Sequence, residues 1–409
     1  FCAQIRVRFI SRSPQYAVTD APIAVPTKLA RHGLSEVVNH LLASAAAVPF
    51  DFLIDNQLLR GSLSKFIASN NISTEDILPV EYLPAVVLSD ETKSSEMDAW
   101  IGCLDTNMDS TLICGCYDGQ VRVCDPEKDF TQIGSQSCHA APIRAVVSWA
   151  GSSAGQLMAT ASKDQSVKLW EVGKKKGKGV TFEHVSTLSG HMNSVECLDI
   201  YGEDPTIISG DWNGVVLGFN ASLAAKAAEE EDGSAKRKKR KGLSGAETSA
   251  AVNTITSFFT LKAHSQAVSG VQACKDASSQ QSAAHSMYTC SWDHSLKLWD
   301  IETQNCVNTS MGPKVMTSLH YSRTANAVAT SHPDGRVRMW DSRSRESTAT
   351  FESFGATDQW ISQVKWVPNS NVLFAAIDYA GHVALWDVRA KVPLSNRATH
   401  DGKALCLDW

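Results

Sequence analysis

Residues 287–300 read Met-Tyr-Thr-Cys-Ser-Trp-Asp-His-Ser-Leu-Lys-Leu-Trp-Asp, and this stretch decides the fold. Its first five residues suit a short strand, the next four a tight turn, and the last five a returning strand. An Asp at the turn favours a hairpin with left-handed backbone positions. Leu296 and Leu298 alternate with Lys297, which is typical of an antiparallel strand with one buried face and one solvent-exposed face.

The same pattern recurs along the chain, because a turn residue is followed six positions later by a bulky closing residue. The six pairs are Asp118/Cys124, Asp164/Trp170, Asn213/Phe219, Asp293/Trp299, Asp334/Trp340 and Ala380/Trp386. The hairpins are predicted at 112–125, 157–171, 207–220, 287–300, 327–341 and 372–387. The closing residues are 46, 49, 80, 41 and 46 positions apart. A period of about 40–45 residues with four short strands indicates a β-propeller, and the long interval contains an insertion.

Three of the units are preceded by a histidine, at His139, His191 and His264. Together with the turn Asp and the closing Trp, these histidines resemble the WD-repeat family. The resemblance implies a buried hydrogen-bond network of His, Asp, Ser or Thr, and Trp in each blade. The residues carried over are His191, His264, Asp164, Asp293, Asp334, Trp170, Trp299 and Trp340. An acid–base or metal-ligand role is the alternative, but the repeat would then create three such centres, so we interpret these residues as structural.

The fold class predicted is mainly β: a seven-bladed WD-repeat β-propeller with an N-terminal α+β domain. Ala404–Trp409 suits the first strand of a further blade, and Ala85–Leu88 is the candidate strand that closes the ring. We expect a domain at 1–84, a linker and closing strand at 85–99, and the propeller at 100–409, incomplete at its C-terminal end. A charged insertion is expected at 221–255.

Composition excludes several classes of protein. The 409 residues are 43% hydrophobic and 20% charged, as in a soluble globular protein. No stretch approaches 18 apolar residues, so no membrane partner is expected. The eleven scattered cysteines contain no CxxC pair, which favours reduced thiols over a zinc site. A net charge of −5 gives no overall bias toward nucleic acid.

The first 84 residues have the element order of a ubiquitin-like grasp fold. Strands are predicted at 4–9, 17–25, 50–54, 58–59 and 78–82, a helix at 34–44 with Ser35 as a candidate N-cap, and a helical turn at 63–68. Residues 33–42, 48–54, 58–60 and 80–82 resemble the NLE domain that precedes WD repeats in eukaryotic ribosome-assembly factors. The whole chain resembles the WD-repeat ribosome-biogenesis family of the PeBoW complex.

That resemblance implies a non-enzymatic assembly factor for large-subunit biogenesis and rRNA maturation, located in the nucleus, nucleolus and nucleoplasm. The implied partners are the block-of-proliferation WD-repeat protein, pescadillo, the midasin ATPase and the pre-ribosomal particle with its rRNA. The Notchless family is the alternative with the same domain order but eight blades. A WD-repeat adaptor in a ubiquitin pathway is a second alternative, although the grasp fold runs on through Pro84 without a terminal Gly-Gly. A propeller hydrolase is disfavoured, because no nucleophile elbow is present.

Two further features suggest sites. Residues 71–77, Asn-Ile-Ser-Thr-Glu-Asp-Ile, form an ordinary polar turn on their own. In the PeBoW family a carboxylate at this place docks on the metal-ion-dependent adhesion site of midasin. The resemblance therefore implies that Glu75, or its neighbour Asp76, completes a partner's Mg²⁺ site, with no cofactor of the chain's own.

The insertion carries opposed charge blocks in a Gly/Ser/Ala background. Its basic hexamer consists of Lys236, Arg237, Lys238, Lys239, Arg240 and Lys241. Such a run suits a nuclear-import signal or a phosphate contact on RNA, and a merely solvated loop is the alternative.

Overall fold

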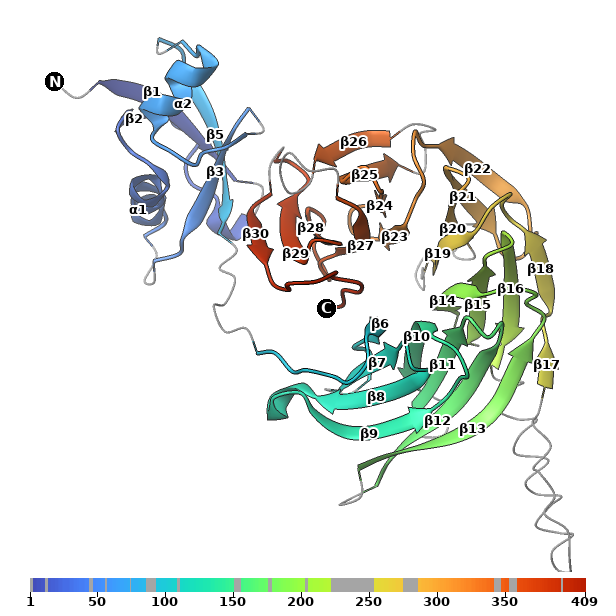
Figure 1. The fold of residues 1–409 in the computed structure, drawn as a ribbon. Helices are drawn as coiled ribbons and strands as arrows, with labels where there is room; N and C mark the ends of the chain where they lie inside the picture. Colours follow the sequence, from blue (N-terminus) through green and yellow to red (C-terminus); the bar gives the residue numbers. More distant parts are fainter. Residues whose placement is uncertain are drawn as a thin grey trace, which may run out of the picture. The chain divides into compact units, whose positions relative to one another are not determined.

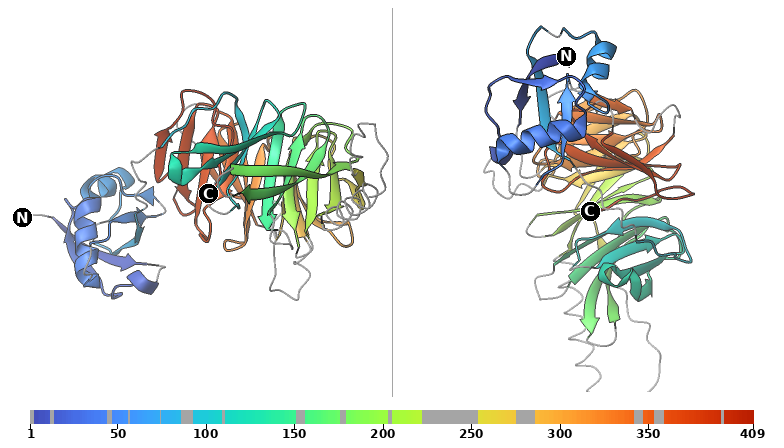
Figure 2. Two further views of the ribbon diagram at one scale, coloured as in Figure 1. Left: turned by 90° about the horizontal axis from the view of Figure 1, so that it is seen from below. Right: turned by 90° about the vertical axis from the view of Figure 1, so that its left-hand side faces the viewer.

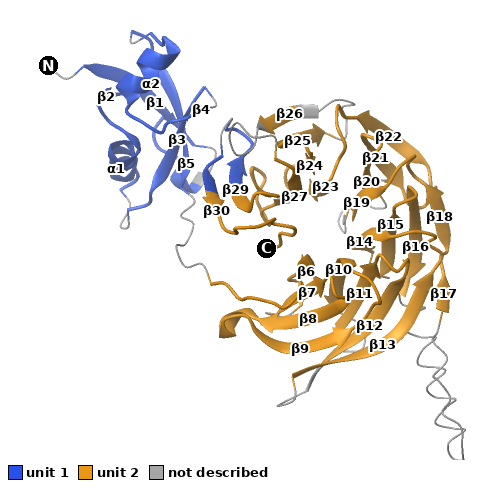
Figure 3. Cartoon of the chain, viewed as in Figure 1, with its two compact units in different colours: residues 1–92, 385–396 blue, residues 93–384, 397–409 orange. Residues whose placement is uncertain are grey.

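The computed structural model divides the chain into two compact units (Figure 3). The first unit contains Phe1–Thr92 and Leu385–Asn396, and the second contains Lys93–Ala384 and Arg397–Trp409. The residues described are 3–11, 14–43, 47–55, 57–73, 75–85, 93–108, 111–150, 156–175, 179–202, 205–221, 254–274, 286–341, 347–352, 359–390 and 393–409.

The first unit is built on one five-stranded mixed sheet in the order β2-β1-β5-β3-β4 (Figure 1). Its strands are β1 (Gln4–Ile10), β2 (Ile23–Pro26), β3 (Phe50–Ile54), β4 (Gln57–Leu58) and β5 (Leu78–Pro84), and its helices are α1 (Arg31–Leu42), α2 (Leu63–Asn70) and the 3-10 turn η1 (Pro14–Tyr16). Strands β1 and β5 run parallel at the centre of the sheet. Along the chain, the order β1, β2, α1, β3, β4, α2, β5 is the ubiquitin-like element order predicted from the sequence.

Two local predictions in this unit are wrong. The strand expected at 17–25 is confined to β2, which pairs with β1 from Ile23 onward. Helix α1 begins at Arg31, so Ser35 is not its N-cap. Ser35 instead lies inside the helix, where its Oγ accepts from Phe50 N and donates to Phe50 O, both at 3.1 Å. Periodicity alone did not distinguish a capping serine from one that ties the helix to the sheet.

Aromatic side chains fill the core of the first unit. Phe50, Phe52 and Tyr82 are almost fully buried, and Phe50 and Tyr82 meet edge to face with ring centroids 5.4 Å apart. Each buried ring removes enough apolar area from water to contribute about 2–3 kcal/mol. The core therefore provides a rigid base for the loops of this small domain.

Among the described residues the propeller has six four-stranded antiparallel blades around a common centre (Figures 1 and 2), and residues 385–396 of the sixth blade are grouped with the first unit. Blade one contains β6 (Ile101–Asp105), β7 (Leu112–Cys116), β8 (Gln120–Asp125) and β9 (Thr131–Ser137), and blade two contains β10 (Ile143–Ala150), β11 (Gln156–Ser162), β12 (Val167–Lys175) and β13 (Gly179–Ser189). Blade three contains β14 (Val195–Tyr201), β15 (Thr206–Asp211), β16 (Val215–Asn220) and β18 (Phe259–Lys262), and blade four contains β19 (Val268–Ala273), β20 (Ser286–Ser291), β21 (Ser295–Asp300) and β22 (Cys306–Met311).

The two remaining blades have the same pattern. Blade five contains β23 (Ser318–Ser322), β24 (Ala327–Ser331), β25 (Arg336–Asp341) and β26 (Ser347–Glu352), and blade six contains β27 (Ile361–Trp366), β28 (Leu373–Asp378), β29 (His382–Asp387) and β30 (Ser395–Ala398). A short additional strand, β17 (Thr254–Thr256), pairs in parallel with β13. The six predicted hairpins are the second and third strands of the six blades, which confirms the propeller.

The tight turn of each hairpin needs a left-handed backbone at the residue after the turn position. Gln165 and His294 adopt φ of 70° there, and Gly214 adopts φ of 82°. A Cβ built on Gly214 would lie 2.2 Å from the carbonyl oxygen of His264. Glycine at this position therefore satisfies both the backbone conformation and the close approach of the next loop.

Ala404–Trp409 occupies the innermost position of a seventh blade. Leu407 N donates to Gln363 Oε1 of β27 at 2.6 Å, and Thr106 N, just after β6, donates to Asp408 Oδ2 at 2.9 Å. Asp408 also pairs with Lys365. The segment thus bridges the sixth and first blades without forming an assigned strand. Of the proposed closing strand, only Ala85 is described, so that prediction lies outside the described residues.

Polar contacts link all seven innermost segments in a cycle. The remaining links are Ser148 to Asp105, Arg144 to Glu196, Ala273 N to Asp199, Tyr321 N to Gln272, and Val364 N to Ser318. Each joins one inner strand to the next, so the ring has seven positions. The inner segments of neighbouring blades are therefore joined through side chains, which bond either to each other, as in Arg144–Glu196, or to a backbone N–H, as in Asp199–Ala273.

Candidate functional surfaces

The loop between α2 and β5 is fixed at both ends. Asn71 caps α2 in a left-handed conformation and donates its N–H to Ile67 O. Ile72 packs against the core of the first unit, and Leu78, which begins β5, is buried. Ile72 and Leu78 therefore anchor the two ends of this segment to the domain.

The backbone of the loop is braced while its acidic side chains face solvent. Arg6 Nη2 donates to Glu75 O at 3.2 Å, and Glu75 N donates to Ser73 Oγ at 3.3 Å. Both Glu75 and Asp76 are exposed. Within the described residues, neither carboxylate forms an ion pair or a side-chain hydrogen bond. The structure therefore presents two adjacent carboxylates on a fixed backbone, next to the exposed Ile77.

Blade two contains a buried tetrad of polar groups. Trp170 Nε1 donates to Thr160 Oγ1 at 3.0 Å, and Thr160 Oγ1 lies 2.8 Å from His139 Nε2. His139 Nδ1 lies 2.9 Å from Asp164 Oδ2. Partial burial alone would raise the pKa of Asp164, but hydrogen bonds from His139 and Ser166 outweigh it and hold the pKa well below the usual range. The carboxylate is thus ionised, and every member of the chain has a partner.

Blade four repeats this tetrad. Trp299, Thr289, His264 and Asp293 are joined by contacts of 2.9, 2.8 and 3.0 Å in the same order. Burial of Asp293 opposes ionisation, and the bonds from His264 and Ser295 again lower its pKa overall. The two blades therefore share one geometry, with the histidine bridging the turn to the closing strand.

Blade three supplies its carboxylate from a different position. His191 Nδ1 lies 3.0 Å from Asp211 Oδ2, two residues before the aligned turn residue Asn213. Asp211 Oδ1 also accepts from Asn213 N and Val215 N at 2.9 Å. Phe219 closes the blade and has no N–H for such a network. The sequence pattern placed the turn residue correctly but did not identify Asp211.

Blade six uses the same shifted carboxylate. Asp378 Oδ1 accepts from Ala380 N and His382 N, both at 2.9 Å. The Gly-Asp-Trp-Asn-Gly and Ile-Asp-Tyr-Ala-Gly turns contain the signal that would have found both residues: an Asp two positions before a turn residue that is not Asp.

Arginine replaces histidine as the partner of the turn Asp in blades one and five. Arg338 makes two bonds to Asp334, at 3.2 and 2.7 Å, and Arg122 holds Asp118 in the same way. Trp340 still donates to Thr330 at 2.7 Å. The structure therefore brings Trp340 into a blade network, but Asp334 binds an arginine four residues later instead of a histidine.

Metal-ligating side chains do not cluster among the described residues. No group of three or more His, Cys, Asp or Glu side chains among them is placed to hold an ion. No helix in this part of the chain is long and apolar enough to cross a bilayer. The ten cysteines in the described part of the chain are free thiols, eight of them buried, and burial raises the pKa of Cys138 and Cys290 to about 12. Such thiols are protonated and unreactive.

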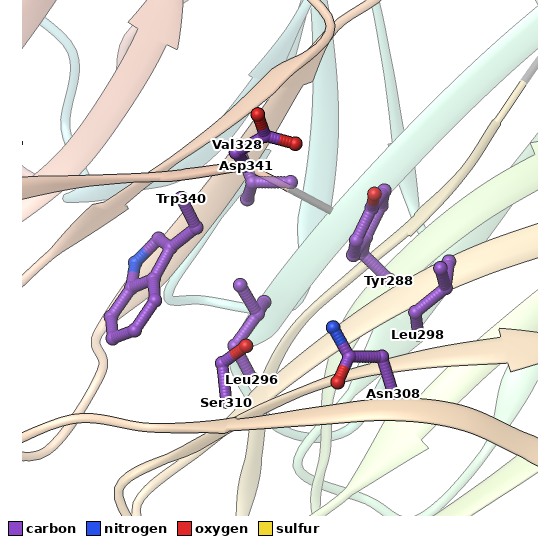
Figure 4. Close-up of a pocket in the computed structure, with 8 residues that line it drawn as sticks. All are labelled: Tyr288, Leu296, Leu298, Asn308, Ser310, Val328, Trp340 and Asp341. Carbon is purple, nitrogen blue, oxygen red and sulfur yellow. The ribbon is translucent and has the colours of Figure 1, made fainter. Parts of the chain in front are cut away.

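A small pocket lies between blades four and five (Figure 4). It is lined by Tyr288, Leu296, Leu298, Asn308, Ser310, Val328, Trp340 and Asp341. The space is at the lower limit for one water molecule, so it is a packing gap between blades and not a substrate site. The basic hexamer at 236–241, and the rest of the insertion except Ala221, Thr254 and Ile255, lie outside the described residues.

Known proteins match both units. The model of the NLE (NUC135) domain matches residues 5–67, and that of the WD domain, G-beta repeat, matches 130–171, 182–219 and 255–300. The chain is thus an NLE-domain protein with a WD-repeat propeller. It is 31% identical to the ribosome biogenesis protein WDR12 homolog of Oryza sativa subsp. japonica, over 99% of this chain and 92% of that protein. The homologs of Arabidopsis thaliana and Chlamydomonas reinhardtii are 30% and 29% identical with the same coverage. The chain belongs to this WDR12 family of ribosome biogenesis proteins.

Proposed function

We propose that this protein is a non-enzymatic assembly factor of the large ribosomal subunit that acts in rRNA maturation as the WD-repeat member of the PeBoW complex. Its propeller would bind the block-of-proliferation WD-repeat protein and, through it, pescadillo on the pre-ribosomal particle. Family membership supports the ribosome-assembly role. The closed cycle of inner segments supports the scaffold role, because a ring tied at seven positions presents its surfaces without internal rearrangement.

The braced loop carries the second half of the proposal. Glu75 would complete the Mg²⁺ coordination of the adhesion site of midasin, since a hard cation of this kind prefers carboxylate oxygen. The observation that supports this role is the contrast within the loop: the backbone is held by Arg6 and Ser73, while the carboxylate faces solvent. A ligand mounted this way transmits force from the ATPase to the domain, and the force would release the protein from the pre-ribosome.

Affinity purification of the tagged full-length chain tests this function. The wild type should recover midasin, pescadillo and pre-ribosomal RNA. Glu75→Ala should lose midasin, keep pescadillo and accumulate on particles, because release fails while scaffolding persists. Asp76→Ala is the matched control, with the same charge change one residue away. Recovery of ubiquitin-ligase subunits without ribosomal factors would contradict the proposal.

We also propose that residues 236–241 direct the protein to the nucleus and nucleolus. Six consecutive cations form the kind of segment that import receptors bind. Deleting Lys236–Lys241 from a fluorescent fusion should move the signal to the cytoplasm, and replacement by six Arg residues should restore it. A deletion variant that stays wholly nuclear would reject the import role.

A further inference from the structure

Ser73 forms one of the two hydrogen bonds that hold the backbone of Glu75 in the loop between α2 and β5. Glu75 N donates to Ser73 Oγ at 3.3 Å, and Arg6 Nη2 donates to Glu75 O at 3.2 Å. Both bonds end on the residue whose carboxylate we propose as a metal ligand. A chemical change at the Ser73 hydroxyl therefore acts directly on the backbone that positions this carboxylate.

The Ser73 side chain is accessible to an enzyme. Ser73 is exposed and lies outside regular secondary structure, and β5 begins only at Leu78. Ser69 is exposed as well, but it lies in the last turn of α2, where its hydroxyl donates to Lys65 O at 2.8 Å. A modifying enzyme has to take its target segment into its own active site, which costs less free energy for a loop than for a helix. Ser73 is therefore the better substrate of the two.

The residues after Ser73 indicate the kind of enzyme. Glu75 and Asp76 follow it at two and three positions, and both are exposed. An enzyme with a cationic substrate groove binds such a segment, because opposite charges orient the two partners during association. Protein kinases that select acidic segments have a groove of this kind. Ser69 is followed by Asn-Asn-Ile and lacks these carboxylates.

Arg6 is placed to bind a phosphate on Ser73. The Ser73 hydroxyl and the Arg6 guanidinium bond to the two ends of the same residue, Glu75. In the part of the chain that the structure describes, no carboxylate pairs with Arg6. A bond from arginine to phosphate is charge-assisted and roughly twice as strong as a bond between neutral groups. A phosphate on Ser73 would therefore compete with Glu75 O for Arg6, and it would also remove the hydroxyl that accepts from Glu75 N.

We propose that Ser73 is a phosphorylation site for a protein kinase that selects acidic segments, and that the phosphate weakens docking through Glu75. In the reaction, Ser73 Oγ attacks the γ-phosphorus of ATP, the bond to the bridging oxygen breaks to release ADP, and the hydroxyl proton passes to the catalytic base of the kinase. The phosphate carries about −1.5 to −2 charges at neutral pH. It draws Arg6 from the Glu75 backbone and adds like charge beside the Glu75 carboxylate.

The effect on docking rests on the proposed function, whereas the modification does not. The loop presents the Glu75 carboxylate in one orientation only while both backbone bonds are intact. Directional coordination of a magnesium ion depends on that orientation, since Mg²⁺ requires nearly ideal octahedral geometry. Phosphorylation thus regulates the release step without any change in the propeller.

Mapping the modification tests the site without midasin. The full chain is incubated with ATP and a purified kinase that selects acidic segments, casein kinase II, and the phosphopeptides are quantified by mass spectrometry. Ser95 is the internal reference, because it is exposed and is followed by the exposed residues Glu96 and Asp98. Ser73 and Ser95 should both acquire phosphate, and Ser69 should not. Absence of phosphate at Ser73 overturns the site, with or without phosphate at Ser95.

Binding to the purified adhesion domain of midasin with Mg²⁺ tests the effect. Phosphoserine is introduced at Ser73 through an expanded genetic code, and phosphoserine at Ser95 is the control with the same added charge. Modification of Ser73 should weaken the affinity at least about tenfold, as expected when two hydrogen bonds are lost, and modification of Ser95 by less than about twofold. Circular dichroism and thermal unfolding of each protein establish that the fold is intact.

Removing the arginine tests the physical cause. Unmodified Arg6→Gln loses one of the two backbone bonds and should bind roughly threefold to fivefold more weakly than the wild type. Phosphate on Ser73 then has no guanidinium to draw away, so it should weaken Arg6→Gln by no more than about a further threefold. A further loss as large as in the wild-type background would contradict the role of Arg6.

The remaining outcomes separate this inference from the proposed function. Absence of wild-type binding overturns docking through Glu75, while the mapping still decides whether Ser73 is modified. Wild-type binding that phosphate on Ser73 leaves unchanged or strengthens overturns the regulation and leaves the docking function standing. Glu75→Gln that binds as tightly as the wild type once Ser73 is phosphorylated would make the phosphate itself the metal ligand and overturn the proposal.

Discussion

Removing the turn carboxylate of blade four should destabilise the propeller by a large fraction of its total stability. Asp293 accepts from His264 Nδ1, Ser265 N and Ser295 N, each at 3.0 Å, and from Ser295 Oγ at 2.6 Å. Its side chain is only 12% exposed, and that of His264 is fully buried. Asp293→Ala therefore leaves a buried imidazole N–H and two turn N–H groups without their acceptor.

The magnitude follows from these contacts. Hydrogen bonds to a charged acceptor contribute about 1.5–3 kcal/mol each, and a buried donor left unsatisfied costs about 1–3 kcal/mol. Water can reach the turn N–H groups in part, so we expect a loss of about 3–5 kcal/mol in the free energy of unfolding. Domains have about 5–15 kcal/mol in total, so the variant should be close to the limit of folding.

Urea unfolding followed by tryptophan fluorescence measures this loss. Asp98→Ala is the control, because Asp98 is exposed and lacks a bond to any described side chain. The double variant Asp293→Ala with His264→Ala should be less destabilised than the sum of the single variants, since both remove the same bond. An Asp293→Ala midpoint equal to that of Asp98→Ala would refute the view that the networks hold the blades.

Two further predictions concern pH and ring closure. Burial, with the charge of Arg338, lowers the pKa of His332 to about 4, against about 6.5 in an unfolded chain. The stability that neutral His332 contributes is therefore complete above about pH 6.5 and is lost as the pH falls toward 4. By pH 5 the free energy of unfolding should have fallen by about 2 kcal/mol. A His332→Gln variant should lack that part of the pH dependence in denaturant titrations. Asp408→Ala removes the bonds to Thr106 and Lys365 that join the seventh position to its neighbours, so it should cost about 2–3 kcal/mol in the same assay and increase hydrogen exchange in β6. An unchanged exchange rate in β6 would mean that the C-terminal segment does not close the ring.

The hairpins could be predicted from the sequence because their determinants are local. A turn residue, a strand alternation and a closing aromatic residue all lie within about fourteen residues, as in 287–300, and no distant partner is needed to place them. A further blade beginning at 404–409 was also predicted from the sequence. Its hydrogen bonds to Gln363 and Thr106 were not, since they join residues far apart in the sequence.

The sequence did not predict the hydrogen-bond partners of some residues, because these partners depend on which side chain can reach the same atom in the folded protein. Asp211 replaces a turn Asp because its carboxylate, two residues earlier, reaches both the turn N–H groups and His191. Arg338 substitutes for histidine because its guanidinium spans the distance from the strand to Asp334. Serine is a common N-cap residue, but Ser35 forms its hydrogen bonds with Phe50 of β3. In each case the three-dimensional arrangement determines the partner, and the residue type alone does not predict it.

The same limit applies to the surfaces. The Glu75 side chain faces solvent while its backbone is bonded to Arg6. The local sequence Ser-Thr-Glu-Asp could not predict this arrangement, because Arg6 lies 69 residues away. Family resemblance suggested Glu75 as the docking residue that we propose, and the structure adds that its backbone is bonded to Arg6.

We propose above that the Glu75 carboxylate completes a magnesium site on another protein. The most direct measurement is the affinity of the full chain for the purified adhesion domain of midasin, with Mg²⁺ and with EDTA. The wild type should bind only with Mg²⁺. Glu75→Gln should weaken binding by more than about tenfold, because a neutral amide is a poor ligand for a hard cation. Asp76→Asn should have little effect. Binding that survives EDTA, or that Glu75→Gln leaves unchanged, would contradict the account.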